Sequence, residues 1–150
     1  MSQLANVFHH QLEEVNAANL SGEALGWAVG KAEGLDVFLA PPEYGNPWRV
    51  FARYQSQAIV HTKRYNPWED WALGGPLAVK YQVSLIPEAH EGPEGTEMSE
   101  RWRASVYYKA GEHYGTDYCG TALIAACQAV VATEFGDTVQ VPKELIQCPA

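Results

Sequence analysis

The sequence predicts an α+β fold, a single small domain whose helices pack on a small, mostly antiparallel sheet. Residues that can cap a helix precede three segments, at about 22–33, 67–73 and 121–135, and the first and last of these carry apolar side chains at helical spacing. The alternation along "WRASVYY" (102–108) predicts a strand. A chain of 150 residues has the length of one domain.

The N-terminal part of the chain comes first. Residues 1–20 show a weak helical pattern, and we expect a leader or a loosely attached helix before a single domain at 21–150. The helix at 22–33 follows Ser21, a favoured N-cap residue, and Glu23 in its first turn complements the helix dipole.

Two glycines four residues apart, Gly26 and Gly30, lie within this helix, where each costs up to about 1 kcal/mol relative to alanine. We interpret them as a place where another element packs closely. After the helix, "DVFLA" (36–40) predicts a short buried strand, and the prolines and glycine of 41–48 predict a loop. The segment "RVFARY" (49–54) is compatible with a strand or a loop.

The second expected helix covers 67–73. Asn66 can cap it, and Pro67 suits its first position. Glu69 stands three residues after the cap, as in a capping box. Gly74 is expected to end the helix.

Further strands and loops follow. "LAVKYQVSLI" (77–86) predicts a strand that ends at Pro87, and the acidic, glycine-containing segment 88–100 predicts an exposed loop. After the strand at 102–108, residues 109–120 predict another loop.

The most apolar segment of the chain, 121–135, predicts a largely buried helix. Thr121 can cap this helix, and Gly136 is placed to end it. "DTVQVP" (137–142) then predicts a short strand.

Three stretches resemble a known family: "LSGEALGWAVGKAEGL" (20–35), "DWALGGPLAVKYQV" (70–83) and "GTALIAACQAVVATEFGDTVQVPKEL" (120–145). They are similar to the NinX-like proteins of phages and prophages, a domain of unknown function, and the motif "DWALGGP" is the most specific part. Ala122 departs from the family, where proline is expected, and the leader is longer than expected. The resemblance implies a phage or prophage origin and the cytoplasm of a bacterial host, and it implies no established reaction.

The composition excludes several classes of partner. An apolar share of 47% with 19% charged residues is typical of a soluble globular protein, and a net charge of −8 argues against nucleic acid as the partner. The longest apolar stretch (122–132) is too short for a bilayer, which needs about 20 residues. The chain has an odd number of cysteines, Cys119, Cys127 and Cys148, and no signal peptide is visible. Both observations favour the reducing cytoplasm as its location.

Catalytic motifs are scarce. Cys119 is a weak candidate nucleophile because a helix N-terminus just after it could lower the pKa of its thiol. The base would have to be one of the upstream histidines, His61, His90 or His113. Because these histidines are isolated from one another, we expect no metal site. The chain also lacks the GxxxxGK[ST] phosphate loop, and we expect no cofactor.

The stretch "WEDWALGGPL", which begins at Trp68, is the main candidate for a binding site. Trp68 and Trp71 are three residues apart and can share one side of a short helix. Asp70 could accept hydrogen bonds, while the N–H groups of Gly74 and Gly75 would be open to a ligand. In the alternative interpretation, one tryptophan anchors the helix in the core and the glycines make a turn.

The two interpretations apply to different residues. We favour the structural role for Trp71 and the paired glycines. For Trp68, Glu69 and Asp70 we favour exposure to solvent. Glu69 and Asp70 are neighbours, so on a helix they face different ways and do not form an acid–base pair.

The main functional hypothesis is a non-enzymatic phage or prophage accessory protein that binds a protein partner or a small ligand. Aromatic residues dominate interface energetics, and the expected exposed anchors are Trp68, Tyr65, Trp48, Tyr107 and Tyr108. One alternative is a small hydrolase or nucleotide-handling enzyme that uses Cys119 or Asp70. Another is a structural subunit that forms a homo-oligomer.

Overall fold

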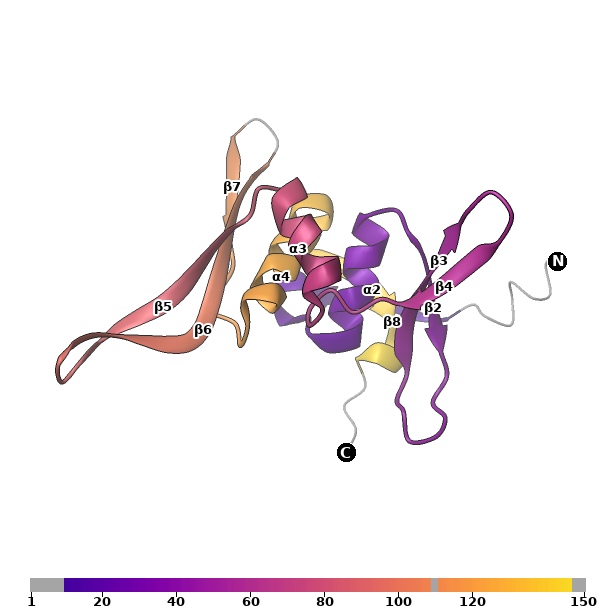
Figure 1. The fold of residues 1–150 in the computed structure, drawn as a ribbon, viewed down its shortest axis with the longest axis horizontal. Coiled ribbons are helices and arrows are strands. Elements are labelled where there is room, and N and C mark those ends of the chain that lie inside the picture. The colour runs from indigo at the N-terminus through magenta and orange to yellow at the C-terminus, as the bar shows by residue number, and fades with distance from the viewer. Residues whose placement is uncertain (1–9, 109–110, 147–150) are drawn as a thin grey trace.

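In the part of the chain that the structure describes, three α-helices lie at the centre, and strands lie on either side of them (Figure 1). The computed structural model describes residues 10–108 and 111–146. The arrangement is a single small α+β domain with antiparallel sheets, which confirms the predicted fold class.

The helices are α2 (Gly22–Ala32), α3 (Trp71–Lys80) and α4 (Ala122–Phe135), with the short 3-10 helices η1 (Ala17–Asn19) and η2 (Lys143–Leu145). The strands are β1 (Leu12–Asn16), β2 (Asp36–Ala40), β3 (Arg49–Gln55), β4 (Val60–Arg64), β5 (Ser84–Gly92), β6 (Gly95–Tyr108), β7 (Glu112–Gly115) and β8 (Thr138–Pro142).

Within residues 10–108 and 111–146, the strands form three separate small sheets, and every strand pairing is antiparallel. Their orders are β1–β8, β2–β3–β4 and β5–β6–β7. In Figure 1 the long β5–β6 hairpin extends away from the helices on one side, while β2, β3 and β4 lie on the other. The helices therefore join the sheets into one domain.

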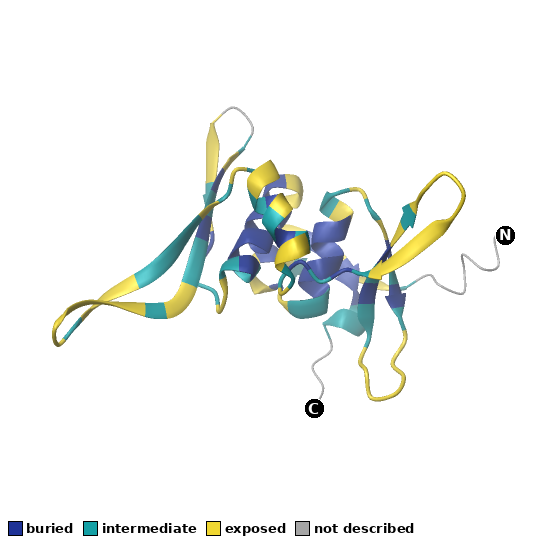
Figure 2. Ribbon diagram, in the orientation of Figure 1, coloured by how far each residue is buried: buried dark blue, intermediate teal, exposed yellow. Residues whose placement is uncertain are grey.

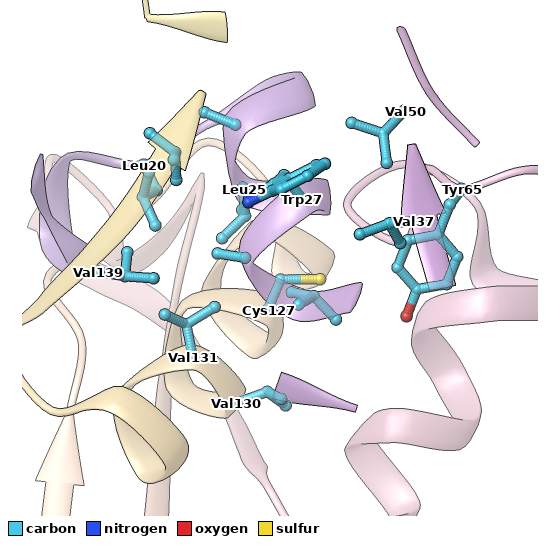
Figure 3. Close-up of a cluster of buried hydrophobic side chains, with 14 of the residues drawn as sticks. Leu20, Leu25, Trp27, Val37, Val50, Tyr65, Cys127, Val130, Val131 and Val139 are labelled. Carbon is cyan, nitrogen blue, oxygen red and sulfur yellow. The ribbon is translucent and has the colours of Figure 1, made fainter. Parts of the chain in front are cut away.

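The core surrounds α4, which is the most buried helix, as its sequence predicts (Figure 2). The larger apolar cluster joins α4 to α2, β2, β3 and β8, and Figure 3 shows part of it around Trp27 and Cys127. A smaller cluster joins α4 to β6 through residues such as Ala104 and Val106. A polar residue in α4, Gln128, donates its side-chain N–H to the Leu20 carbonyl over 3.0 Å.

The two glycines of α2 allow close packing, as predicted. A Cβ atom at Gly26 would lie 2.5 Å from Cζ3 of Trp68, and one at Gly30 would overlap the side chain of Val37. Glycine lowers the helix propensity at these two positions, but it lets Trp68 and Val37 pack directly against the backbone of α2.

The bounds predicted for the second helix are wrong. The chain makes a turn at 67–69, and α3 begins after Asp70, whose side chain accepts the Ala72 N–H over 2.9 Å. The helix then continues through Gly75 and Pro76, although we expected it to end at Gly74. Tertiary packing outweighs propensity here, because Gly74 and Leu77 are buried on the helix face toward the core.

The predicted strand at 77–86 and the predicted loops are wrong in the same region. Residues 77–80 belong to α3, and β5 starts only at Ser84. The segment 88–100 is the end of the β5–β6 hairpin, in which Glu91 pairs with Thr96. Part of the expected loop at 109–120 is strand β7. Backbone pairing holds these polar residues in strands although few of them contact the core.

The N-terminal region also differs from the prediction. Leu12–Asn16 form strand β1 against β8, so a helix is wrong for this part, and residues 1–9 lie outside the described residues. The undecided segment at 49–54 is strand, within β3. The predictions of strands at 36–40 and 137–142 and of the helices at 22–33 and 121–135 are confirmed to within a few residues.

Candidate functional site

A groove of about 560 Å³ lies between the start of α3, strand β6 and the start of α4. We call it the tryptophan groove, because its lining includes Trp68, Trp71 and Trp102. Glu69, Glu100 and residues 120–124 complete the lining. The groove therefore brings together three of the predicted site residues, Trp68, Glu69 and Trp71, with Glu100, Trp102 and residues 120–124, which were not predicted as site residues.

Trp71 is the most exposed of the three tryptophans. It is the first residue of α3, and 58% of it is accessible to solvent. The Asp70 cap sets the start of the helix, so Trp71 points outward while Leu77 faces the core. The predicted structural role of Trp71 is wrong, because a large exposed indole contributes little to the fold.

Trp68 precedes the helix and is half-buried, which contradicts the expectation that it is the exposed member of the pair. Its ring packs on α2 at Gly26, and the Arg64 guanidinium lies 5.6 Å from its centroid. Arg64 is itself held by an ion pair with Glu23. Trp68 is thus held in place by its packing on α2, whereas Trp71 lines the groove with an exposed side chain.

Trp102 comes from β6, far from the other two in the sequence. Its backbone exchanges hydrogen bonds with Cys119, at 2.9 Å and 2.6 Å, and this bridge places the start of α4 beside β6. Thr121 caps α4 by accepting the Ile124 N–H over 3.1 Å. Within the described residues, no side chain caps the N–H groups of Ala122 and Leu123.

The charged residues that line the groove are both acidic. Glu69 and Glu100 are both exposed, and Glu69 accepts one hydrogen bond from the Asn66 side chain over 2.8 Å. Within the described residues, neither glutamate forms an ion pair. The groove can therefore offer indole faces, free carboxylate oxygens and backbone N–H donors to a ligand.

The other predicted site residues have structural roles. Tyr65 is 3% exposed, and burial raises the pKa of its hydroxyl, so it is no surface anchor. Trp48 is half-buried, with its ring edge-on to His10. The Gly74 N–H donates to the Asp70 carbonyl over 2.9 Å, and Gly75 lies inside α3. The idea of open glycine N–H groups is therefore wrong.

Sequence reasoning missed Trp102 and Glu100. The alternation in "WRASVYY" identified Trp102 as a strand residue, and the acidic stretch before it was assigned to a loop. Trp102 and Glu100 line the same groove as Trp71 because β6 pairs, through the bridge between Trp102 and Cys119, with the segment before α4. The exposed Tyr107 and half-buried Tyr108 lie at the far end of β6, beside His113 of β7.

Cys119 does not have the surroundings of a catalytic thiol. Burial raises its pKa, whereas an activated thiolate needs a lowered one. The Sγ atom contacts Oε1 of Gln128 and the Asp117 carbonyl, each at 3.4 Å. His113 is paired instead with Ser105, whose Oγ lies 2.5 Å from Nε2 on the exposed surface of β6 and β7.

No group of three or more histidine, cysteine, aspartate or glutamate side chains in 10–108 and 111–146 is arranged to hold a metal ion. Over the same ranges, no helix combines the length and the apolar character that crossing a membrane requires.

No curated protein matches the chain. The family profile described as "Bacteriophage P22, NinX" matches residues 16–134, which include the tryptophan groove and most of the core. This confirms the resemblance seen in the sequence: the chain belongs to the NinX family of phage proteins, whose function is unknown.

Proposed function

We propose that the protein is a non-enzymatic accessory protein that acts in the bacterial cytoplasm by binding a basic segment of a protein partner in the tryptophan groove. The observation that carries the proposal is the exposure of Trp71 beside Glu69 and Glu100. Large exposed aromatic side chains near one another mark binding surfaces more than they stabilise a fold.

The ligand chemistry follows from the lining. A lysine or arginine side chain is attracted to the face of an indole, and tryptophan is the best aromatic partner for such a cation. Glu69 and Glu100 add negative charge at the same place. A cationic side chain in the groove would therefore contact Trp71 and at least one carboxylate.

The start of α4 favours a peptide over a small cation. Backbone N–H groups in the first helical turn point out of the helix and attract acceptors. Those of Ala122 and Leu123 lack a side-chain cap within the described chain, and both residues line the groove. A peptide can place a carbonyl oxygen on these donors while its basic side chain contacts the indole and the carboxylates.

The charge of the whole protein supports the same partner. The net charge of −8 speeds encounter with a basic partner and disfavours an acidic one. The raised pKa of Cys119, and the lack of a hydrogen bond from it to a histidine in the described chain, argue against the form of the hydrolase alternative that uses Cys119.

The five tryptophans provide the test, because each indole N–H gives its own nuclear magnetic resonance signal. The probe is an acetylated, amidated pentapeptide with arginine at its centre and alanine elsewhere, and the same peptide with glutamine is the control. The arginine peptide is expected to shift the signals of Trp68, Trp71 and Trp102 and to leave Trp27 and Trp48 in place.

Trp71→Ala is expected to weaken binding of the arginine peptide about tenfold, equivalent to about 1.4 kcal/mol, by removing the exposed indole face. Val79→Ala is the matched control, since Val79 is also exposed on α3 but lies outside the groove. Equal binding of the glutamine peptide would contradict the proposed basic ligand. A chain that self-associates through Trp71 would show a dimer mass in native mass spectrometry, and would replace the partner with a second copy.

A further inference from the structure

A second cavity, of about 490 Å³, lies between α2 and the ribbon of β1 and β8, where α4 ends. Small-molecule sites usually enclose about 300–1,000 Å³. Trp27 and Lys31 line it from α2, Leu12 from β1, Val139 from β8 and Phe135 from α4. We call it the Trp27 cavity.

The lining is mainly apolar and partly exposed. Leu12 and Phe135 stand at its rim, where 48% and 40% of their surfaces are accessible to solvent. Trp27 and Val139 are buried beneath them. Two large apolar side chains are exposed to solvent above buried apolar residues. Covering this surface with an apolar ligand would lower the free energy by removing it from water.

The floor contains a hydrogen-bond donor without a partner. The Trp27 side chain lies among the buried apolar residues of the core (Figure 3). It is 7% exposed, and its buried indole N–H has no hydrogen-bond acceptor in the described residues.

The charge at the mouth of the cavity is positive. Lys31 lies one helical turn from Trp27, with its ammonium 4.9 Å from the centroid of that ring. Within the described residues, Lys31 forms no ion pair, whereas His10, which also lines the cavity, is paired with the Glu144 carboxylate over 3.0 Å. Lys31 therefore supplies an unpaired positive charge to the lining, in a protein whose net charge is −8.

We propose that the Trp27 cavity binds an apolar carboxylate, a small molecule with an aliphatic or aromatic body and one anionic group. The body covers Leu12, Phe135 and Val139, and the carboxylate pairs with the Lys31 ammonium. Neither a neutral apolar molecule nor a cation uses both parts of this lining. The site is separate from the tryptophan groove and does not depend on the function proposed for it.

The test uses octanoate as the probe and octylammonium as its matched cation, each titrated into the whole chain. Octanoate is expected to shift the indole N–H signal of Trp27 and to leave those of Trp68, Trp71 and Trp102 unchanged. Octylammonium is expected to bind more weakly. If the Trp27 signal stays in place under octanoate, or if octylammonium binds equally well, the proposal is wrong.

A pair of lysine variants tests the role of the charge. Lys31→Gln is expected to weaken octanoate binding about two- to fivefold, the range for an ion pair near solvent. Lys80→Gln is the control, because the Lys80 ammonium also lies near an aromatic ring, 5.4 Å from that of Tyr81, but outside the cavity. Unchanged binding in Lys31→Gln, or equal weakening in both variants, would overturn the assignment.

Discussion

The tryptophan groove and the Trp27 cavity lie at opposite ends of α4 and differ in charge. The groove contains the start of α4 and two glutamates, whereas the cavity contains Phe135, at the end of α4, and a lysine. The 14 residues of α4 span about 21 Å between them. Both regions are rich in indole and apolar surface, so charge is what separates their expected ligands.

The two regions also differ in how they are built. The walls of the groove come from segments that are distant in sequence, and an exposed tryptophan forms its edge. The cavity is also lined by segments distant in sequence, but its tryptophan is buried, and Trp27 and Lys31 are one turn apart on the same helix. A substitution in the α3 region is therefore expected to change the groove and leave the cavity intact.

The largest expected effect is that of Gly74→Ala. A Cβ atom at this position would overlap the Pro67 carbonyl oxygen and lie 2.7 Å from Cδ2 of Leu123, so α3 would have to move from the turn before it and from α4. We expect a loss of about 1–3 kcal/mol in the free energy of unfolding, measured by chemical denaturation. Binding of the arginine peptide should weaken, while octanoate binding stays unchanged.

Gly75→Ala is the control for this prediction. A Cβ atom at Gly75 would meet only Cε3 of Trp71, at an ordinary contact distance of 3.7 Å. Alanine also has the higher helix propensity, so stability should be unchanged or rise by up to about 1 kcal/mol. Similar losses in both variants would show that the close packing at Gly74 does not hold the groove.

A smaller effect is expected at the helix cap. Asp70→Ala removes the acceptor for the Ala72 N–H, and we expect a loss of about 1 kcal/mol in the free energy of unfolding, with Asp70→Asn close to wild type. Glu69→Ala should leave the free energy of unfolding nearly unchanged, because the side chain is exposed. It should weaken binding of the arginine peptide, because it removes a negative charge from the groove. The prediction fails if Asp70→Ala retains wild-type stability.

The smallest effect concerns thiol chemistry beside the groove. Burial raises the pKa of Cys119, and it raises that of Cys127 to about 12, so both thiols remain protonated at neutral pH. Because the thiolate is the reactive species, alkylation by iodoacetamide at pH 7.5 should be slower than that of a free cysteine derivative. Rapid, selective alkylation of Cys119 would instead support the hydrolase alternative and make the groove an active site.

Helices with strong local signals could be predicted from the sequence. Ser21 precedes α2 and Thr121 precedes α4, as expected. The apolar sequence of α4 correctly predicts that this helix is buried. These features depend on residues a few positions apart, and local spacing determines which side chains share a helix face. The family could also be recognised, because its motifs lie in such local segments.

The start of α3 could not be predicted, because two caps compete within five residues. Asn66 and Asp70 are both suitable, and the carbonyl of Asn66 does accept the N–H groups of Glu69 and Asp70 in a turn. The choice of Asp70 follows from packing, since it buries Leu77 and sets Gly74 against Leu123. Shifting the helix start also exchanged the environments expected for Trp68 and Trp71.

The sequence by itself determined the fold class, the family, the acidic charge and the buried central helix, since composition and short-range periodicity suffice for these. Only the tertiary structure decided that Trp102 joins Trp71, and that Trp27 lies beneath the exposed Leu12 and Phe135. Such contacts connect residues far apart in the chain, and the free energy that selects them comes from burying surfaces of several elements together. No local pattern of residues carries that information.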